Sequence, residues 1–312
     1  MRIGIIGGGG ISGTHVRAAQ GIEGVEIAAV YGHNREKTAA LAASAGAVAY
    51  DDFERFLAHP LDMVAIGSPS GLHAAQATAA VRRGLHALVE KPLDVTTSKI
   101  DALAAEAERA GRLVGVIFQE RLLPDVVALK RRLDAGEFGT PLFIAGQMHW
   151  YRPPEYYAAS TWRGTPTLDG GGVLINQGIH TLDLMLHLFG PARRVSGRAA
   201  TRLHAIDVED TAAALIEFES GAFGVFEGTT AASPGFPRRI EIAGSAARAV
   251  YEDPARPATV ADATPHRRVF EDFIEAVRTG RPPMCDAREG RRSVALIDAI
   301  YRSARTGEFE TP

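Results

Sequence analysis

The fold is decided near the start of the chain by Arg2-Ile-Gly-Ile-Ile-Gly-Gly-Gly-Gly-Ile-Ser-Gly13. Its apolar first part predicts a buried strand, and the run of glycines predicts a turn into a helix that begins near Ile11. A strand, a turn of the form Gly-x-Gly-x-x-Gly and a helix direct backbone N–H groups and a helix N-terminus towards a dinucleotide pyrophosphate. The stretch therefore predicts a dinucleotide-binding domain.

The glycine motif can be aligned in two registers. One begins directly after the strand (Gly7-x-Gly9-x-x-Ser12), and the other begins one residue later (Gly8-x-Gly10-x-x-Gly13). The first is favoured because the turn should follow the strand immediately, and serine is small enough for the third position. The cofactor contacts predicted from this turn are Gly7, Gly9, Gly10, Ile11 and Ser12.

The tip of the second predicted strand bears on the choice between NAD(H) and NADP(H). An acidic residue at this tip usually accepts the ribose hydroxyls of NAD. No carboxylate stands there, and basic side chains follow in the segment Val30–Lys37. Contact with a 2′-phosphate, and hence a preference for NADP(H), is predicted, the alternative being that Arg35 and Lys37 merely begin a solvent-exposed helix. The predicted contacts are His33, Asn34, Arg35 and Lys37.

Lys91 follows the apolar strand His86–Glu90 and precedes Pro92. Ligands bind at the carboxyl ends of strands in a doubly wound sheet, so Glu90 and Lys91 are predicted cofactor contacts. The lysine can also donate to a substrate hydroxyl oxygen and stabilise the alkoxide that forms. We predict that Lys91 is catalytic, and the alternative is a surface Glu-Lys pair at a strand exit.

A third segment, Gly170–His180, runs from three glycines into a predicted helix. Asn176, His180 and Asp183 have the i, i+4, i+7 spacing of one helix face. His180 can accept a hydroxyl proton as hydride leaves, and Asn176 can orient the substrate or the imidazole. The glycines would let another molecule approach the helix start closely. Asn176 and His180 are therefore predicted catalytic residues, although a buried core histidine is the ordinary alternative.

Aromatic and guanidinium side chains stand just before this helix and suit either a polyhydroxylated ring or a subunit interface. They are His149, Arg152, Tyr156, Tyr157, Trp162 and Arg163. The predicted substrate contacts are Lys91, Arg152, Tyr156, Trp162, Arg163, Asn176 and His180. No metal site is predicted, because His180 and Asp183 lack a convincing third ligand.

Residues 2–118 alternate between short apolar runs and helical patterns, which predicts a parallel, doubly wound sheet covered on both faces. The expected strands are Arg2–Ile6, Val25–Tyr31, Asp62–Gly67, His86–Glu90 and Leu113–Phe118. The expected helices are Ile11–Gln20, Arg35–Ala45, Phe53–Ala58, Leu72–Arg83 and Thr97–Ala110.

After Glu120, strands follow one another with short links, which predicts an open, mainly antiparallel sheet in an α+β domain. The expected strands are Leu142–Trp150, Arg193–Thr201, Thr211–Phe218, Phe223–Thr230, Arg239–Ala243 and Ala247–Tyr251. The expected helices are Pro124–Ala135, Gly172–Phe189, His266–Thr279 and Ala287–Ala304. We expect a dinucleotide-binding domain over 1–120 and a substrate-binding and oligomerisation domain over 121–312, with the last helix able to pack back on the first domain.

Composition agrees with a two-domain protein. The chain has 312 residues, of which 46% are hydrophobic, and a net charge of -3 that offers no basic field for nucleic acid or a membrane surface. Cys285 is the only cysteine, so no intrachain disulfide can form. No leader and no apolar run of about 20 residues is present, so a cytoplasmic location is expected.

With these residues placed, the chain resembles the Gfo/Idh/MocA oxidoreductases, which include glucose-fructose oxidoreductase and inositol dehydrogenase. The resemblance rests on the glycine turn, Glu90-Lys91-Pro92 and the Gly170–Asp183 segment. It also covers Ser68-Pro69 with His73, Trp162-Arg163, Glu289-Gly290-Arg291 and Ala299–Ser303. It implies a Rossmann domain, an open-sheet domain, and dimers or tetramers paired through that sheet.

The resemblance implies that Lys91 and His180 are catalytic and adds Ser68, Pro69 and His73 to the cofactor contacts. Asn176 stands where many members carry aspartate, so here an amide would position the hydroxyl. The expected reaction is hydride transfer between NAD(P) and a secondary hydroxyl of a sugar, inositol or related cyclic polyol. Elimination, glycoside cleavage or epimerisation through transient oxidation is an alternative, and a cofactor-binding sensor without turnover is another.

Overall fold

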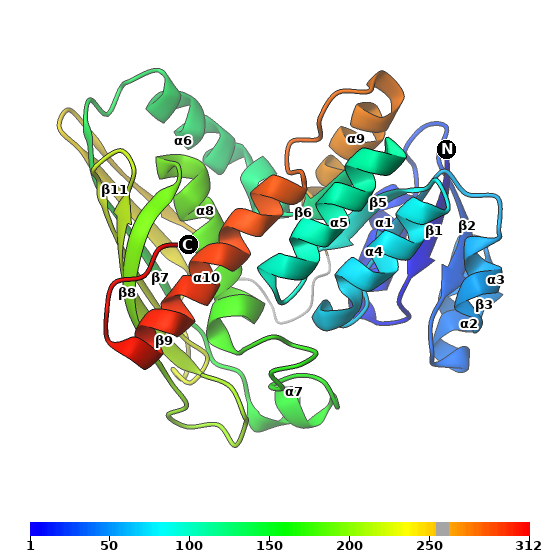
Figure 1. Ribbon diagram of the computed structural model, residues 1–312, viewed down its shortest axis with the longest axis horizontal. Helices are drawn as coiled ribbons and strands as arrows, with labels where there is room; N and C mark the ends of the chain where they lie inside the picture. The colour runs from blue at the N-terminus through cyan, green and yellow to red at the C-terminus, as the bar shows by residue number, and fades with distance from the viewer. Residues whose placement is uncertain (254–261) are drawn as a thin grey trace. The chain divides into compact units, whose positions relative to one another are not determined.

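The computed structural model describes residues 1–253 and 262–312, which form two compact units (Figure 1). Of the described residues, the first unit holds 1–119 and 262–291, and the second holds 120–253 and 292–312. The last helix, α10 (Ala287–Thr306), belongs to the first unit up to Arg291 and to the second beyond it.

The first unit is built on a six-stranded parallel sheet with the order β3-β2-β1-β4-β5-β6. The strands are β1 (Arg2–Ile6), β2 (Glu26–Tyr31), β3 (Val48–Tyr50), β4 (Met63–Ile66), β5 (His86–Glu90) and β6 (Val114–Ile117). The predicted parallel, doubly wound sheet is confirmed. β3 was not predicted, because it has only three residues and two of them are exposed. Strand order reverses between β1 and β4, and ligands bind at such a switch point.

Helices cover both faces of this sheet. They are α1 (Gly10–Ala19), α2 (Arg35–Ala45), α3 (Phe53–Leu57), α4 (His73–Arg82), α5 (Thr97–Ala110) and α9 (Thr264–Thr279), with a 3₁₀ turn at Ser70–Leu72. Right-handed crossovers that run in opposite directions from the switch point put α1 and α4 on opposite faces. α9 packs on α1, and α5 packs on α4 (Figure 1). Apart from β3 at the edge, the strands are buried on both sides, which is why they read as continuous apolar runs.

The second unit contains a six-stranded mixed sheet with the order β12-β11-β7-β10-β9-β8. Its strands are β7 (Pro141–His149), β8 (Ala192–Ala200), β9 (Thr211–Phe218), β10 (Phe223–Thr229), β11 (Arg239–Gly244) and β12 (Arg248–Glu252). Only the β7–β10 pair is parallel, so the expectation of a mainly antiparallel sheet is confirmed.

The two faces of this sheet differ. Helix α8 (Ile179–Phe189) packs on β7 (Figure 1). Alternate residues of the strands, among them Ile144, Met148 and Phe226, are buried. The opposite face exposes large apolar side chains, among them Phe143, Leu215, Phe223 and Val225. Phe223 lies opposite Phe143, and Val225 lies opposite Leu215, so these four form one continuous patch.

The segment before α8 differs from the prediction. One continuous α-helix was expected from Gly172 to Phe189, but the structure has a π-helical turn at Val173–Gly178 and an α-helix only from Ile179. Two further elements of this unit, α6 (Pro124–Asp134) and the short α7 (Pro154–Ala158), lie before it in the chain, together with a 3₁₀ turn at Gln119–Leu122. No helix in the described residues is long and apolar enough to cross a membrane.

Candidate active site

The glycine turn has distinct roles for its residues. Gly7 has a φ of 123°, and a side chain there would collide with Ser12 and with the backbone of Gly67. Gly9 is the N-cap of α1, and around Gly9 and Gly10 no atom lies within 4 Å of where a Cβ would be. The turn is therefore closed on its protein side by Gly7 and Ser12 and open at the start of the helix. This geometry suits a pyrophosphate at the helix N-terminus.

The exposed polar side chains at the tip of β2 differ in the contacts that they make within the protein. Asn34 caps α2 by accepting the Lys37 backbone N–H at 2.9 Å. Arg35 pairs with Asp51 at 2.5 Å. His33 stacks edge-on against Tyr31, with ring centroids 5.6 Å apart. No carboxylate occupies the tip itself, and the Arg35 guanidinium already has a partner.

The loop after β4 is tied to the turn after β5 by His73. This side chain is 1% exposed, and its ring nitrogens lie 2.8 Å from the Ser68 carbonyl oxygen and 2.7 Å from the Pro92 carbonyl oxygen. The Ser68 hydroxyl donates to Gln76 at 2.5 Å. His73 therefore links the two loops, and the Lys91–Pro92 peptide bond that it supports is cis.

Glu90 is buried between two histidines. Its Oε1 lies 3.0 Å from His15 Nε2 on α1 and 3.4 Å from His266 Nε2 on α9, and its Oε2 accepts the Lys91 backbone N–H at 3.2 Å. Burial by itself would raise the pKa of Glu90, but hydrogen bonds and charge from the two histidines outweigh it and hold that pKa well below the usual range. Burial lowers the pKa of His15. The carboxylate thus anchors the residue before Lys91 to two helices.

In the second unit, buried Glu209 holds the start of the π-helical turn. Its carboxyl oxygens accept the backbone N–H groups of Gly172 at 3.0 Å and Leu174 at 2.9 Å, and the hydroxyl of Tyr301 at 2.8 Å. Burial raises the pKa of Glu209 and outweighs these donors. Burial, with the nearby Glu209, also raises the pKa of Tyr301 well above its ordinary value, so this hydroxyl remains a donor.

Glu209 and Tyr301 also explain the glycines before the turn. A Cβ on Gly172 would overlap the Glu209 carbonyl oxygen, and a Cβ on Gly171 would overlap the Tyr301 hydroxyl. The expectation that these glycines leave room for another molecule was therefore wrong at both positions. The Glu209 backbone and the Tyr301 side chain occupy this space.

Asn176 is fixed by a carboxylate that the sequence did not single out. Its side-chain Nδ2 donates to Asp169 Oδ1 at 2.5 Å, and Asp169 Oδ2 accepts the Gly164 backbone N–H at 2.8 Å. Asp169 is 2% exposed. Because the amide nitrogen of Asn176 faces Asp169, the side-chain oxygen of Asn176 faces the other way.

His180 lies beside a buried charge network. Its Nδ1 is 4.0 Å from Glu120 Oε1, an electrostatic contact longer than a hydrogen bond. Glu120 pairs with the fully buried Arg238, which also pairs with Asp253 at 2.7 Å. Burial alone would lower the pKa of Arg238, but the two carboxylates outweigh it and raise that pKa. Every charge in this network therefore has an oppositely charged partner.

Asp183 does not share the environment of His180. It accepts hydrogen bonds from Arg121 at 2.8 and 2.6 Å and from the Ser293 hydroxyl at 2.9 Å. It is a buried structural ion pair.

The aromatic segment before the π-helical turn forms a stack. Arg152 lies over the rings of Trp150 and Tyr156, with its guanidinium carbon 5.5 and 4.8 Å from their centroids. Arg163 lies over Tyr156 and Trp162, at 4.5 and 5.4 Å. The Tyr156 hydroxyl accepts a hydrogen bond from the side-chain amide of Gln177 at 3.3 Å, which ties the stack to the residue after Asn176.

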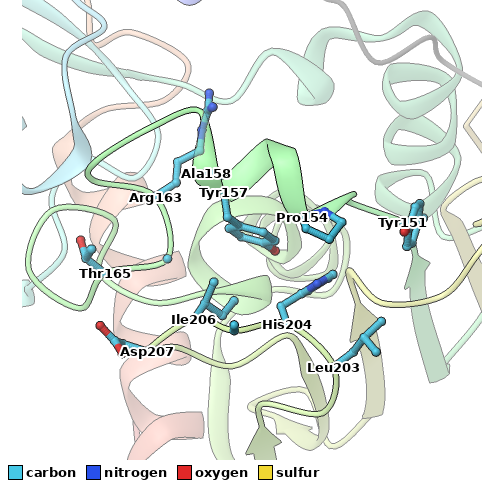
Figure 2. Close-up of a pocket in the computed structure, with 12 residues that line it drawn as sticks. Tyr151, Pro154, Tyr157, Ala158, Arg163, Thr165, Leu203, His204, Ile206 and Asp207 are labelled. Atoms are coloured by element: carbon cyan, nitrogen blue, oxygen red, sulfur yellow. The ribbon is translucent and has the colours of Figure 1, made fainter.

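A pocket of about 710 Å³ adjoins α7 and is lined in part by Arg163 (Figure 2). Tyr157, His204 and Ile206 form its walls, and the rings of Tyr157 and His204 are 5.0 Å apart. Figure 2 shows the guanidinium of Arg163 directed away from the rings of this pocket. The rings of Tyr156 and Tyr157 are 5.1 Å apart, so the arginine-aromatic stack and this pocket are neighbours.

The residues that position this site were only partly visible in the sequence. Glu90 stood out because it precedes Lys91, and Tyr301 lies in the Ala299–Ser303 stretch that carries the family resemblance, but no role was predicted for His15, Asp169, Glu209 or Tyr301. The glycine triplet indicated a close neighbour without identifying it. In the described ranges, no group of three or more His, Cys, Asp or Glu residues is arranged to hold a metal ion.

The Asp169–Asn176 contact makes a prediction that is independent of catalysis. In the Asn176→Asp variant two carboxyl groups would stand about 2.5 Å apart and would have to share a proton, which raises the pKa of the pair. The free energy of unfolding should then fall as pH rises above about 4, because the unfolded chain releases that proton more readily.

Denaturant unfolding at pH 4 to 8 measures this effect. The double variant Asp169→Asn/Asn176→Asp restores a single carboxylate and should recover the pH dependence of the unchanged protein. A stability of Asn176→Asp that does not change with pH relative to that protein would contradict the contact.

Comparison with known proteins agrees with this geometry. Residues 1–118 match the family model described as the oxidoreductase family NAD-binding Rossmann fold. Residues 126–250 match the GFO/IDH/MocA C-terminal domain, and residues 259–311 match the oxidoreductase family C-terminal alpha/beta domain.

The similar proteins cover almost the whole chain. D-xylose 1-dehydrogenase (NADP(+)) 2 of Haloferax volcanii is 31% identical, over 98% of each chain. Inositol 2-dehydrogenase 2 of Saccharopolyspora erythraea is 29% identical, over 98% of this chain and 94% of that one. The crystal structure of the WlbA dehydrogenase from Bordetella pertussis, in complex with NADH and UDP-GlcNAcA, is 31% identical, with a TM-score of 0.92 over 100% of this chain and 98% of that one. The chain therefore belongs to the Gfo/Idh/MocA family of oxidoreductases and is an NAD(P)-dependent dehydrogenase.

Proposed function

We propose that this enzyme transfers a hydride between NAD(P) and a secondary hydroxyl of a sugar or cyclic polyol, with Lys91, Asn176 and His180 acting on the substrate. The observation that carries the proposal is the place of Lys91, directly after the carboxyl end of β5, where ligands of such sheets bind. Relatives named as xylose and inositol dehydrogenases support the substrate class.

The residues divide the proton chemistry between them. When bound, the nicotinamide accepts or returns the hydride. His180 takes the proton from the substrate hydroxyl, and the Lys91 ammonium stabilises the oxygen as negative charge develops on it. Asn176 offers its side-chain oxygen to a substrate hydroxyl, because Asp169 holds its amide nitrogen. The carboxylate of Asp169 thus stands one hydrogen bond behind the position where many family members carry aspartate.

The catalytic roles make a direct prediction. Lys91→Met or His180→Ala should lower kcat by at least ~10², since each removes a group that acts on the transferring proton or on the developing charge. Cofactor affinity, measured by the fluorescence of bound NADPH or NADH, should be largely kept.

Two matched variants control for the loss of a lysine or a histidine. Lys130→Met removes a half-buried lysine paired with Asp134, and His59→Ala removes a histidine that contacts Tyr50. Both should retain turnover close to that of the unchanged enzyme. Unimpaired turnover in Lys91→Met and His180→Ala would refute the assigned roles.

The tip of β2 supports a preference for NADP(H). It has no carboxylate to accept ribose hydroxyls, and Arg35, although paired with Asp51, leaves Lys37 and His33 exposed beside it. An ammonium or imidazolium there can pair with a 2′-phosphate.

Steady-state kinetics test the cofactor preference. The KM for NADP+ should be lower than that for NAD+ by ~10-fold, about the strength of one charge-assisted contact. Lys37→Ala should raise the KM for NADP+ and leave that for NAD+ unchanged, whereas Lys99→Ala, on another helix of this unit, should change neither. A lower KM for NAD+ would exclude a 2′-phosphate site.

The apolar patch of the second sheet supports a homo-oligomer paired through that face. Phe143 and Phe223 are each 44% exposed on neighbouring strands, and Leu215 is 40% exposed. Contiguous apolar surface of this kind marks an association site.

Light scattering coupled to gel filtration should report a dimer or tetramer. Phe223→Asp should dissociate it by placing an unpaired charge in the interface, whereas Val48→Asp on β3 of the other unit should not. A monomeric unchanged protein would rule out this interface.

A further inference from the structure

Arg152 and Arg163 are distinguished from the other arginines around the candidate site by their lack of an acidic partner. Neither forms an ion pair with any described residue, and the Nε atom of each is buried without a hydrogen-bond partner there. The Arg163 guanidinium makes a long hydrogen bond, from Nη1 to the Tyr156 carbonyl oxygen at 3.5 Å.

Three arginines of the same unit show the contrasting case, in which carboxylates neutralise the charge. Arg121 pairs with Asp183, Arg238 pairs with Glu120 and Asp253, and Arg194 pairs with Glu217 at 2.7 Å. Two guanidiniums on the ring of one tyrosine repel each other, and partial burial weakens their hydration. An anion bound between or beside the two guanidiniums would offset both their mutual repulsion and their weakened hydration.

The pair adjoins the residues assigned to the substrate. The guanidinium carbons of Arg152 and Arg163 lie 4.8 and 4.5 Å from the Tyr156 ring centroid, and Tyr156 is hydrogen bonded to Gln177, next to Asn176. The stacking holds each planar group in one orientation, and an oriented guanidinium can bind two oxygens of a carboxylate or phosphate at once.

The 710 Å³ pocket adjoins the two guanidiniums, because Arg163 lines it and the rings of Tyr156 and Tyr157 are 5.1 Å apart. Its walls are mainly apolar and aromatic, and the Arg163 guanidinium points away from them (Figure 2). The charged ends of Arg152 and Arg163 therefore meet over the ring of Tyr156, which is hydrogen bonded to Gln177.

We propose that the substrate carries a negatively charged group, a carboxylate or a phosphate, which Arg152 and Arg163 bind while the hydroxyl to be oxidised faces Asn176 and His180. This proposal rests on the proposed function and narrows its substrate class from neutral polyols to acidic sugars. The shared chemistry is that of an oxyanion, and the two sources are a sugar acid and a phosphorylated or nucleotide-linked sugar.

Matched substrates test the charge preference. Glucose, glucuronate and glucose 6-phosphate would be compared as one set, and N-acetylglucosamine and UDP-N-acetylglucosamine as another, each with NAD+ and NADP+. At least one anionic member should exceed its neutral counterpart in kcat/KM by ~10- to ~10²-fold, the range for a charge-assisted hydrogen bond or two. Preference for glucuronate identifies a carboxylate, and preference for a phosphorylated member identifies a phosphate.

Variants then locate the recognition. Arg152→Gln and Arg163→Gln should each raise the KM for the preferred anionic substrate by ~10-fold or more, and by a larger factor than the KM for its neutral counterpart, while the KM for the cofactor stays within ~2-fold. Arg194→Gln removes an arginine that has a carboxylate partner and should leave the KM for the anionic substrate unchanged. Thermal unfolding of each variant reports any structural damage separately.

Calorimetric titration of the same anions into the NADH- or NADPH-loaded protein separates this inference from the proposed function. Anion binding that the two arginine variants abolish, without any turnover, would support the subsite and reject the dehydrogenase reaction on these sugars. Oxidation of neutral sugars with no anion preference would overturn the subsite and leave the function standing. A rise only in the KM for the cofactor, or no anion binding and no anion preference, would also overturn the subsite.

Discussion

The second unit depends on one buried carboxyl group. Glu209 accepts the first backbone N–H groups of the π-helical turn, and Tyr301 donates to it from α10. These N–H groups lie at a helix start and have no partner within the turn, and leaving one of them unpaired in the interior costs about 1–3 kcal/mol. Only glycine fits at positions 171 and 172 beside these two residues. The direction in which Asn176 and His180 leave the turn follows from this close contact.

A buried carboxyl group also lies next to each residue to which a catalytic role is assigned. Asp169 holds Asn176, Glu120 lies near His180, and Glu90 binds the backbone of Lys91. Each of these carboxyl groups is buried, and each is itself held by histidine, arginine or backbone N–H groups. The hydrogen bond to Asp169 holds Asn176 in one orientation, because moving that side chain would take a donor away from a buried carboxylate.

Sequence patterns predicted the first unit more closely than the second. Strands such as His86–Glu90 and helices such as Arg35–Ala45 and Thr97–Ala110 were predicted to the residue, because glycines and caps end them and apolar runs define them. The π-helical turn was missed since its sequence has ordinary helical periodicity, and the distortion comes from Glu209, more than 30 residues away. The expectation that Gly171 and Gly172 leave room for another molecule was wrong for a similar reason. A glycine indicates that something lies close by, but it does not identify that neighbour.

The sequence by itself determined the parallel sheet, the mixed sheet and the chemical types at the candidate site, because periodicity and glycine placement act over a few residues. It also placed the arginines and aromatic residues before the helix without distinguishing a ligand site from an interface. Only the tertiary structure decided which charges are neutralised inside the protein. Arg121 pairs with Asp183, 62 residues away in the chain, and Arg238 pairs with Glu120, 118 residues away, and with the nearer Asp253. Arg152 and Arg163 pair with no carboxylate in the described residues. Ion pairing depends on distances in space, and no local pattern encodes them.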